Sequence, residues 1–351
     1  MSELQKFWDS KKVLITGHTG FKGSWLSLFL NYLNSDLYGI SREKKEGIYK
    51  ISKLEDLFES ELFTDIATND NKVVEDYIKT VEPDIVFHFA AQSLVIEGYK
   101  NPKDTIYSNI IGSYNIMEVV NEVKTIKSLI ISTTDKVYKN SNSKNKEDSE
   151  LGGKGFYSSS KVAVENLITA FINSTMNKDL NISTVRSGNV IGGGERANNR
   201  LLTDLINSAQ SNKDFILRMP DSIRPWQYIL DSIYGYLLVA EDNFNNGRSE
   251  VFNLNSEPNN KFNSKYLSDL FIKNWGSQIK VINENQDKFK EVDILTINSE
   301  KAKNELGWSP KYDIPNTINN IVAWEKHHMD KESHNPDFSL KQISDYLQQI
   351  D

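Results

Sequence analysis

Short apolar runs alternate with longer amphipathic stretches along the first half of the chain. The apolar runs predict strands near residues 12–16, 36–40, 84–89 and 128–132, and the periodic stretches predict helices over 103–122 and 157–175. The runs at 84–89 and 128–132 are apolar on both faces, as in strands that helices cover from both sides. Strands and helices that alternate in this way form a parallel sheet, so the pattern predicts an α/β fold.

The pattern changes in the second half of the chain. A further strand is predicted over 182–186, and from about residue 190 glycine turns, short helices and Asn-rich loops follow. We therefore predict a first domain over residues 1–187 and a smaller, mixed α/β C-terminal substrate domain over 188–351. A segment near 230–255 is expected to return to the first domain.

The composition is that of a soluble globular protein. The chain has 351 residues, 38% of them hydrophobic and 25% charged, and a formal net charge of −7. No apolar run approaches the ~20 residues of a membrane span, and the net negative charge offers no electrostatic case for a nucleic-acid partner. The absence of cysteine excludes disulfides and thiolate catalysis. The amino terminus lacks the apolar core of a signal peptide, so a cytoplasmic location without membrane partners is expected.

A glycine-rich turn follows the first predicted strand. Gly17, Gly20 and Gly23 have the spacing Gly-x-x-Gly-x-x-Gly and lead from that strand into a stretch of helical periodicity. Glycines permit a tight turn and close backbone approach, and the helix amino terminus offers free N–H groups to a pyrophosphate. The turn therefore predicts a dinucleotide site in a Rossmann-type, doubly wound parallel sheet. An ordinary glycine loop between strand and helix is the alternative.

A tyrosine and a lysine lie one helical turn apart in Tyr-Ser-Ser-Ser-Lys. The four-residue spacing puts Tyr157 and Lys161 on one face of a helix, where the lysine charge favours the phenolate. A phenol with a pKa lowered from ~10 can take a proton from a sugar or alcohol hydroxyl at neutral pH. By itself the pair is a weak signal, and an ordinary surface helix is the favoured interpretation until the other motifs are considered. The polar segment 139–148 precedes this helix and is predicted to be a mobile loop that flanks the active-site entrance.

Together with the glycine turn, the Tyr157–Lys161 pair and the segment Thr-Thr-Asp-Lys at 133–136 resemble the extended short-chain dehydrogenase/reductase superfamily. Four strings further resemble the CDP-glucose 4,6-dehydratases within it. They are Gly-His-Thr-Gly-Phe-Lys-Gly-Ser-Trp-Leu at 17–26, Ala-Ala-Gln-Ser-Leu-Val at 90–95, Arg-Ser-Gly-Asn-Val-Ile-Gly-Gly-Gly at 186–194 and Ile-Arg-Pro-Trp-Gln at 223–227. Phe-Lys-Gly-Ser-Trp and Arg-Pro-Trp-Gln are the discriminating pieces, because related nucleotide-sugar dehydratases and epimerases usually differ there.

The resemblance implies an NAD-dependent lyase that converts CDP-glucose to CDP-4-keto-6-deoxyglucose, in deoxysugar biosynthesis for lipopolysaccharide O-antigen. C4 is oxidised, water is lost across C5–C6, and hydride returns to C6, so the cofactor is unchanged overall. By the same resemblance Tyr157 takes the proton of the 4-hydroxyl, helped by Lys161. Thr134 orients that hydroxyl, and Asp135 protonates the departing C6 hydroxyl.

Lys136 stands where many sugar dehydratases have the glutamate that removes the C5 proton, whereas the CDP-glucose group has lysine. An ammonium cannot accept a proton. Either burial near Lys161 and the positive cofactor ring depresses the pKa of Lys136, or the charged lysine stabilises the developing enolate while another group acts as base. We favour enolate stabilisation, and the residues alone leave both open.

Substrate and cofactor contacts are also implied by the resemblance. A guanidinium can fork onto a diphosphate, which favours arginines for the nucleotide sugar. The expected substrate contacts are Gln92, Arg186, Asn189, Arg200 and Arg224. The expected cofactor contacts are Gly17, Thr19, Gly20, Phe21, Lys22, Gly23, Ser41, Arg42, Asp65, Ile66, Ala90, Ala91, Gln92, Asn109, Tyr157 and Lys161.

The second predicted strand ends in Ser41 and Arg42 rather than in the carboxylate that usually binds the ribose of NAD. NAD is expected from the resemblance, with NADP left open because serine and arginine could accept a 2′-phosphate. His88 is interpreted as a packed histidine. The five histidines show no metal-ligand spacing, so no metal site is predicted.

Three alternatives to CDP-glucose dehydration remain at this point. They are a 4,6-dehydratase of another nucleotide sugar, a nucleotide-sugar epimerase or reductase, and a non-catalytic dinucleotide sensor. Asp135 argues against an epimerase, and the set Thr134, Tyr157 and Lys161 argues against a sensor. The superfamily resemblance also implies a homodimer built from the helices at 103–122 and 157–175.

Overall fold

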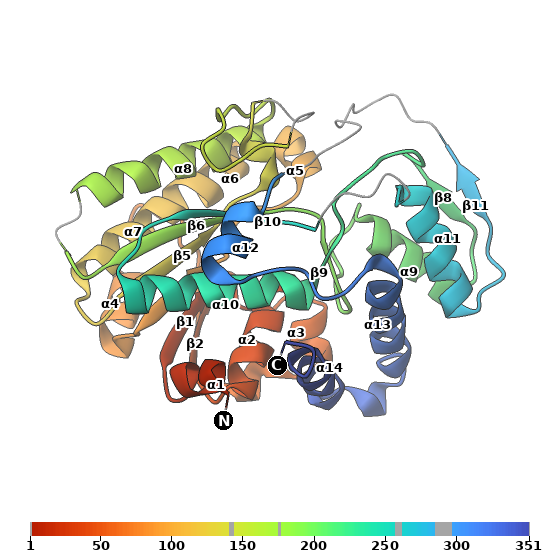
Figure 1. The fold of residues 1–351 in the computed structure, drawn as a ribbon, viewed down its shortest axis with the longest axis horizontal. Coiled ribbons are helices and arrows are strands. Elements are labelled where there is room, and N and C mark those ends of the chain that lie inside the picture. Colours follow the sequence, from red (N-terminus) through yellow and green to blue (C-terminus); the bar gives the residue numbers. More distant parts are fainter. Residues whose placement is uncertain (1, 140–143, 175–176, 257–261, 285–296, 351) are drawn as a thin grey trace.

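The computed structural model describes residues 2–139, 144–174, 177–256, 262–284 and 297–350. Its largest element is a seven-stranded sheet in the order β10-β6-β5-β4-β1-β2-β3 (Figure 1), with all neighbouring strands parallel. The strands are β1 (Lys12–Thr16), β2 (Asp36–Ser41), β3 (Phe58–Phe63), β4 (Ile85–His88), β5 (Ser128–Ser132), β6 (Asn181–Ser187) and β10 (Val251–Leu254). The predicted Rossmann-type doubly wound sheet is confirmed, and its order reverses between β1 and β4, where such sheets bind ligands.

Side chains of the central strands alternate between two apolar cores. Val13 and Ile15 of β1 belong to one core, whereas Leu14 between them belongs to the other. In β4 the same alternation separates Phe87 from Val86. Because successive strand residues point to opposite faces, this arrangement requires helices on both sides of the sheet.

Helices cover both faces of the sheet, and Figure 1 shows α8 and α10 on opposite sides of it. The first face is covered by α1 (Glu3–Trp8), α2 (Phe21–Tyr32), α10 (Ile229–Asn246), α12 (Glu300–Leu306) and α14 (Asp337–Leu347). The second face is covered by α4 (Lys72–Val81), α7 (Gly112–Glu122) and α8 (Phe156–Ser174).

Shorter helical segments connect these elements. They are α3 (Ile48–Ile51), η1 (Leu54–Leu57), α5 (Val95–Lys100), α6 (Pro102–Ile106), the π-helical η2 (Tyr107–Ile111) and η3 (Asp135–Val137). The helix predicted over 103–122 is thus a run of α6, η2 and α7, and the helix predicted over 157–175 is α8.

A third apolar core organises much of the second half of the chain. It lies among α9 (Leu201–Ser211), α11 (Ser264–Trp275), α13 (Ile314–His327) and the strand pair β8 (Phe215–Leu217) and β11 (Val281–Asn283). A second small pair joins β7 (Val190–Ile191) to β9 (Gln227–Tyr228), and η4 (Lys331–Ser333) precedes α14. In Figure 1 this part lies beside the carboxyl end of the large sheet.

The second half of the chain is more regular than the sequence pattern predicts. α10 is a helix of 18 residues, and β10 pairs with β6 at the edge of the large sheet. α10 buries polar Asp231, Ser232 and Asn243 along with its apolar residues, which obscures its helical periodicity. Of the predicted loop 139–148, residues 140–143 lie outside the described residues. None of the helices in the described ranges has the length and apolar character to cross a bilayer.

Candidate active site

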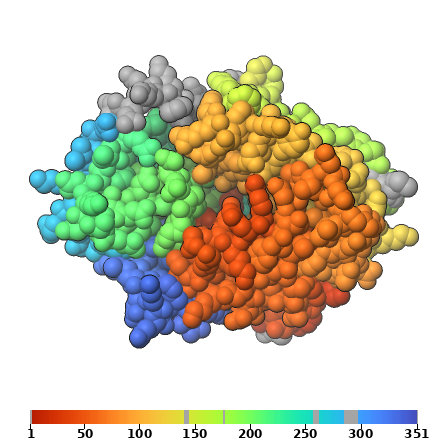
Figure 2. Space-filling model, turned by 180° about the vertical axis from the view of Figure 1, so that it is seen from behind, coloured from red at the N-terminus to blue at the C-terminus, as the bar shows by residue number. Residues whose placement is uncertain are grey.

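A cavity of about 1350 Å³ lies at the carboxyl ends of the central strands. In Figure 2 the surface is hollowed between the orange N-terminal part and the green residues of the second half. Most of the predicted site residues line it. They are Gly17, Thr19, Gly20, Phe21, Lys22, Gly23, Ser41, Arg42, Asp65, Ile66, Ala90, Ala91, Thr134, Lys136, Tyr157, Lys161, Asn189, Arg200 and Arg224.

The glycine turn forms one wall of this cavity. Gly17 follows β1 with φ +75°, a left-handed conformation that favours glycine. Gly20 caps α2 without a side-chain hydrogen bond, so the amino terminus of this twelve-residue helix presents backbone N–H groups to the cavity. A Cβ atom on Gly23 would lie 2.2 Å from the carbonyl oxygen of Gly17. The turn therefore fits the pyrophosphate of a dinucleotide.

Replacing Gly23 with alanine is expected to abolish dinucleotide binding, because the methyl group would push the turn away from the helix that supports it. The expected loss of NAD affinity is at least about 100-fold, as for other misplaced binding elements. Isothermal titration calorimetry with NAD⁺ would measure it. Gly247→Ala is the matched control, because its φ of +65° also strains an alanine while a Cβ there meets nothing within 4 Å, so it should cost stability without changing NAD affinity. Unchanged NAD affinity in Gly23→Ala would contradict the assignment.

At the far end of β2, Ser41 and Arg42 are already engaged by protein groups. The Ser41 hydroxyl lies 3.1 Å from Nδ1 of His18. Arg42 donates to the Ser108 hydroxyl at 3.1 Å, and its guanidinium lies 3.9 Å from Asp65 and 3.5 Å from Asp104. Asp65 thus brings a carboxylate to this end of the cavity although β2 carries none there.

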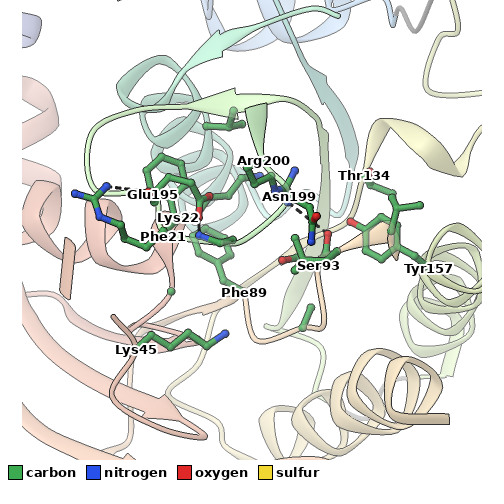
Figure 3. A pocket seen from close by; sticks show the side chains of 18 of the residues that line it. Phe21, Lys22, Lys45, Phe89, Ser93, Thr134, Tyr157, Glu195, Asn199 and Arg200 are labelled. Atoms are coloured by element: carbon green, nitrogen blue, oxygen red, sulfur yellow. Dashed lines mark hydrogen bonds between the residues drawn. The ribbon is translucent and has the colours of Figure 1, made fainter. Parts of the chain in front are cut away.

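Tyr157 and Lys161 project from α8 toward the end of β5. Both are buried, and the ammonium of Lys161 donates to the carbonyl oxygen of Ser132 at 3.0 Å. Burial and the neighbouring charge of Lys22 lower the pKa of Lys161 to about 8. Figure 3 shows Tyr157 beside Thr134 at one end of the cavity.

The electrostatics of Tyr157 differ from the sequence interpretation. Burial raises the pKa of the phenol, and the groups that oppose this rise are Lys136, the Thr134 hydroxyl and Arg200. Lys161 is not among these opposing groups, and its ammonium donates to the Ser132 carbonyl oxygen instead. The expected lowering of the Tyr157 pKa by Lys161 was therefore wrong for the protein alone.

Asp135 lies behind the cavity wall rather than on it. Its side chain is completely buried, and a Cβ atom on Gly188 would lie 2.0 Å from its Oδ2. Its Oδ1 accepts a hydrogen bond from the Thr134 hydroxyl at 3.0 Å and lies 3.4 Å from Nζ of Lys136. Thr134 and Lys136 line the cavity, so Asp135 is connected to it only through its contacts with these two side chains.

Three further polar side chains offer donors to the cavity. Arg224 is buried and lines it, and Arg200 extends toward the carbonyl oxygen of Ser93 at 3.5 Å, as Figure 3 shows. Nε of Arg200 and Nδ2 of Asn189 are buried without a hydrogen-bond partner among the described residues. Buried donors of this kind suit an anionic, polar ligand such as a diphosphate.

Three predicted contact residues do not line the cavity. The Gln92 amide donates to Thr105 at 2.8 Å and accepts from the Leu94 N–H at 2.5 Å. Asn109 accepts from the Gln92 N–H at 2.8 Å and donates to Ser160 at 2.9 Å. These two residues support the wall from behind.

Arg186 is the third of these residues, and its guanidinium forms a buried ion pair with Glu165 at 2.9 Å. The substrate contact expected for Arg186 is thus corrected, because its fork already binds a protein carboxylate.

Contacts between distant segments explain two of the sequence strings. Nε1 of Trp25 donates to the carbonyl oxygen of Gly193 at 3.0 Å, and Lys22 donates to the Ser187 hydroxyl at 2.8 Å. The Phe-Lys-Gly-Ser-Trp string therefore holds the end of β6 and the glycine-rich segment after it against the wall that the glycine turn forms.

His88 lies between two hydroxyl groups in the core. Its Nδ1 is 2.7 Å from Thr16 and its Nε2 is 2.9 Å from Ser113. Burial lowers its pKa to about 3, so it is neutral. The interpretation of His88 as a packed histidine is confirmed.

Sequence reasoning missed several cavity residues, among them Ser93, Glu195, Arg196, Asp204 and Arg218. Arg196 forks onto the buried carboxylate of Glu325 in α13 at 2.7 and 2.8 Å. Ser93 lies in the string at 90–95, whereas no motif marks the other four positions, because they meet the site only when the second half of the chain folds over the sheet.

Comparisons with known proteins agree with this geometry. The family model described as GDP-mannose 4,6 dehydratase matches residues 14–321. The chain is 34% identical to CDP-glucose 4,6-dehydratase of Salmonella typhimurium, over 98% of each protein. It is 25% identical to dTDP-glucose 4,6-dehydratase of Haemophilus influenzae, over 89% of this chain and 97% of that protein.

Solved structures share the fold. UDP-glucose 4-epimerase of Thermotoga maritima has a TM-score of 0.78 and 22% identity, with 91% of this chain and 99% of that chain covered. MoeE5 in complex with UDP-glucuronic acid and NAD has a TM-score of 0.77 and 18% identity, over 90% and 99% of the two chains.

Proposed function

Because the chain belongs to the GDP-mannose 4,6 dehydratase family within the extended short-chain dehydrogenases/reductases, we propose that it dehydrates CDP-glucose to CDP-4-keto-6-deoxyglucose. The observation that carries the proposal is the convergence of Thr134, Lys136, Tyr157 and Lys161 on the cavity that the glycine turn opens. The identity of the nucleotide rests on the Salmonella typhimurium relative, which is named for CDP-glucose.

NAD is the proposed cofactor, held by the glycine turn, the amino terminus of α2 and Asp65. When bound, NAD would accept the hydride of sugar C4 and return it to C6. Asp65 supports NAD over NADP, because its carboxylate shares the end of the cavity with Arg42 and offsets the charge that would attract a 2′-phosphate.

Proton handling falls to the residues at the end of β5 and on α8. The Tyr157 oxygen accepts the 4-hydroxyl proton as C4 becomes a ketone, and the Thr134 hydroxyl orients the substrate. The positive charges of Lys136 and Arg200 favour the phenolate against burial. Lys161 adds its charge beneath the site at pH values below its pKa of about 8.

Loss of water follows from the acidity that the ketone confers on C5–H. As this C–H bond breaks, the C5 proton passes to a base other than the charged Lys136, and the Lys136 ammonium stabilises the negative charge on the enolate oxygen. The C6–O bond then breaks, and the leaving hydroxyl takes a proton to depart as water. The Thr134 hydroxyl or the Lys136 ammonium, which line the cavity, gives that proton to the leaving group, and a protonated Asp135 replaces it through its contact with these two groups.

An assay with a panel of nucleotide-diphosphate glucoses would test the proposal. Incubation with NAD⁺ and detection by NMR are expected to show a 4-keto-6-deoxy product, with CDP-glucose giving the highest kcat/KM. A higher value for another nucleotide would correct the substrate, and a C4 epimer without dehydration would favour an epimerase, the activity of several structural neighbours. No product from any of them would refute the dehydratase.

Deuterium at C4 of the substrate is expected at C6 of the product, because the hydride is returned within the same active site. Mass spectrometry of product formed in the presence of excess unlabelled NADH would check this. Dilution of the label by the added cofactor would contradict internal return.

A homodimer is proposed through α6, η2, α7 and α8, which expose Ile106, Tyr107, Tyr114 and Ile172. Tyr114 packs against Phe171 with ring centroids 5.8 Å apart, which joins α7 to α8 in one apolar face. Replacing Tyr114 with glutamate is expected to give a monomer by light scattering, because dimerisation would bury its charge. Ile216→Glu, at the exposed position of β8, is the control and should remain dimeric.

A further inference from the structure

The ion pair between Glu165 and Arg186 is buried and well formed. Nε of Arg186 donates to Oε1 of Glu165 at 3.0 Å, and Nη2 donates to Oε2 at 2.9 Å. Both side chains are 4% exposed. A two-point bond of this kind fixes the relative orientation of α8 and β6 as well as their distance.

Each side of this ion pair also holds one hydroxyl group. The Thr133 hydroxyl donates to Oε1 of Glu165 at 2.6 Å. Nη1 of Arg186 donates to the Tyr138 hydroxyl at 3.0 Å, and the guanidinium lies 5.1 Å from the centre of the Tyr138 ring. Thr133 and Tyr138 are the residues that flank the segment 134–137, which carries Thr134 and Lys136.

The ion pair is also attached to the helix of the catalytic tyrosine. Glu165 lies one turn beyond Lys161 and two turns beyond Tyr157 on α8, so these side chains share a face. Glu165 is itself part of α8, and its carboxylate accepts a hydrogen bond from Thr133 at the end of β5. It therefore links the helix to this strand end. Lys161 joins α8 to the end of β5 as well, through the Ser132 carbonyl oxygen, and Glu165 adds a second link that also holds Arg186 of β6.

We propose that Glu165 and Arg186 are positioning residues, which hold the segment 134–137 and the Tyr157–Lys161 face of α8 at a common distance from the sugar. The inference rests on the proposed function for its kinetic test. Neither residue touches the cavity, so their effect acts through Thr133 and Tyr138. This role also explains why the string at 186–194 begins with Arg186. From the sequence alone, this arginine is expected to bind substrate.

Two conservative variants test the proposal. Thr133→Val and Tyr138→Phe each remove one hydroxyl and leave the ion pair in place. We expect each to lower kcat about tenfold or more, with KM for the nucleotide sugar changed less than about twofold, because misplacement of reacting groups acts on the chemical step. Tyr138→Phe also frees Asn253, whose Oδ1 accepts from the Tyr138 hydroxyl at 2.6 Å.

Tyr346→Phe is the matched control. Its hydroxyl is also buried and donates to Asp231 at 2.9 Å, in the core between α10 and α14. This variant is expected to lose stability to a similar degree while keeping the wild-type kcat. Equal kcat values in all three variants, or equal losses in all three, would overturn a positioning role.

A measurement without turnover separates this inference from the proposed function. In protein with ¹³C-labelled tyrosine, the Tyr157 resonance is assigned by its disappearance in Tyr157→Phe. We expect it to shift in Thr133→Val and to stay unchanged in Tyr346→Phe. If no nucleotide sugar reacts with the wild type, the dehydratase is refuted, and this resonance alone decides the positioning role. An unchanged Tyr157 resonance in Thr133→Val would overturn it.

Discussion

Replacing Tyr157 with phenylalanine is expected to lower kcat by about 10³ or more, while NAD⁺ binding and the folded structure are retained. The variant keeps the aromatic ring that packs in the cavity wall and loses only the oxygen that accepts the 4-hydroxyl proton. A positioned acid–base group contributes about 10² to 10⁴ to a rate, and this one acts in the first chemical step. Every later step depends on the ketone that this step forms, so the loss appears in kcat for the whole reaction.

Stopped-flow measurement of NAD⁺ reduction with CDP-glucose would locate the defect in C4 oxidation. Tyr346→Phe again serves as the control, because it removes a buried hydroxyl far from the cavity lining. Retention of more than about a tenth of the wild-type rate in Tyr157→Phe would show that another group accepts the proton.

Replacing Lys136 with methionine is expected to suppress proton exchange at C5 by about 100-fold, the effect of removing one electrostatic contact to a developing oxyanion. C4 oxidation should fall less. It falls to some degree because the Lys136 charge also opposes the rise in the Tyr157 pKa that burial causes. The side chain lines the cavity next to Asp135, so methionine retains its length and removes its charge.

The two steps are separated by measuring deuterium incorporation at C5 in D₂O and the rate of NAD⁺ reduction in the same protein. Lys72→Met is the control, since Lys72 is exposed on α4, where it pairs with Asp76. Equal losses of C5 exchange and C4 oxidation in Lys136→Met would count against enolate stabilisation and favour a general loss of the phenolate.

The first half of the fold follows from local patterns. The apolar runs at β1, β4 and β5 are predicted at nearly the observed bounds, because a strand covered on both faces must be apolar at successive positions. α10 and β3 were not predicted. α10 is long but buries polar residues such as Asp231, and β3 has an edge position with half-buried residues, so neither shows a clean period.

The candidate site divides in a similar way. Glycine spacing and the Tyr157–Lys161 spacing are local, and both motifs line the cavity as expected. Arg186 and Asp135 lie in equally distinctive strings, yet neither reaches the cavity. Sequence spacing does not report which side of a strand end or loop a side chain takes, and for these two residues a buried partner decided it.

The sequence by itself determined the α/β class, the cofactor turn and the residue types that can move protons, because each depends on neighbours within one or two turns of the chain. Tertiary structure alone decided what those groups can do together. It placed Asp135 behind Thr134 and Lys136, turned Lys161 toward Ser132, and fixed Arg186 on Glu165. Burial and long-range contacts set these orientations and the associated pKa shifts, and both depend on segments that are distant along the chain.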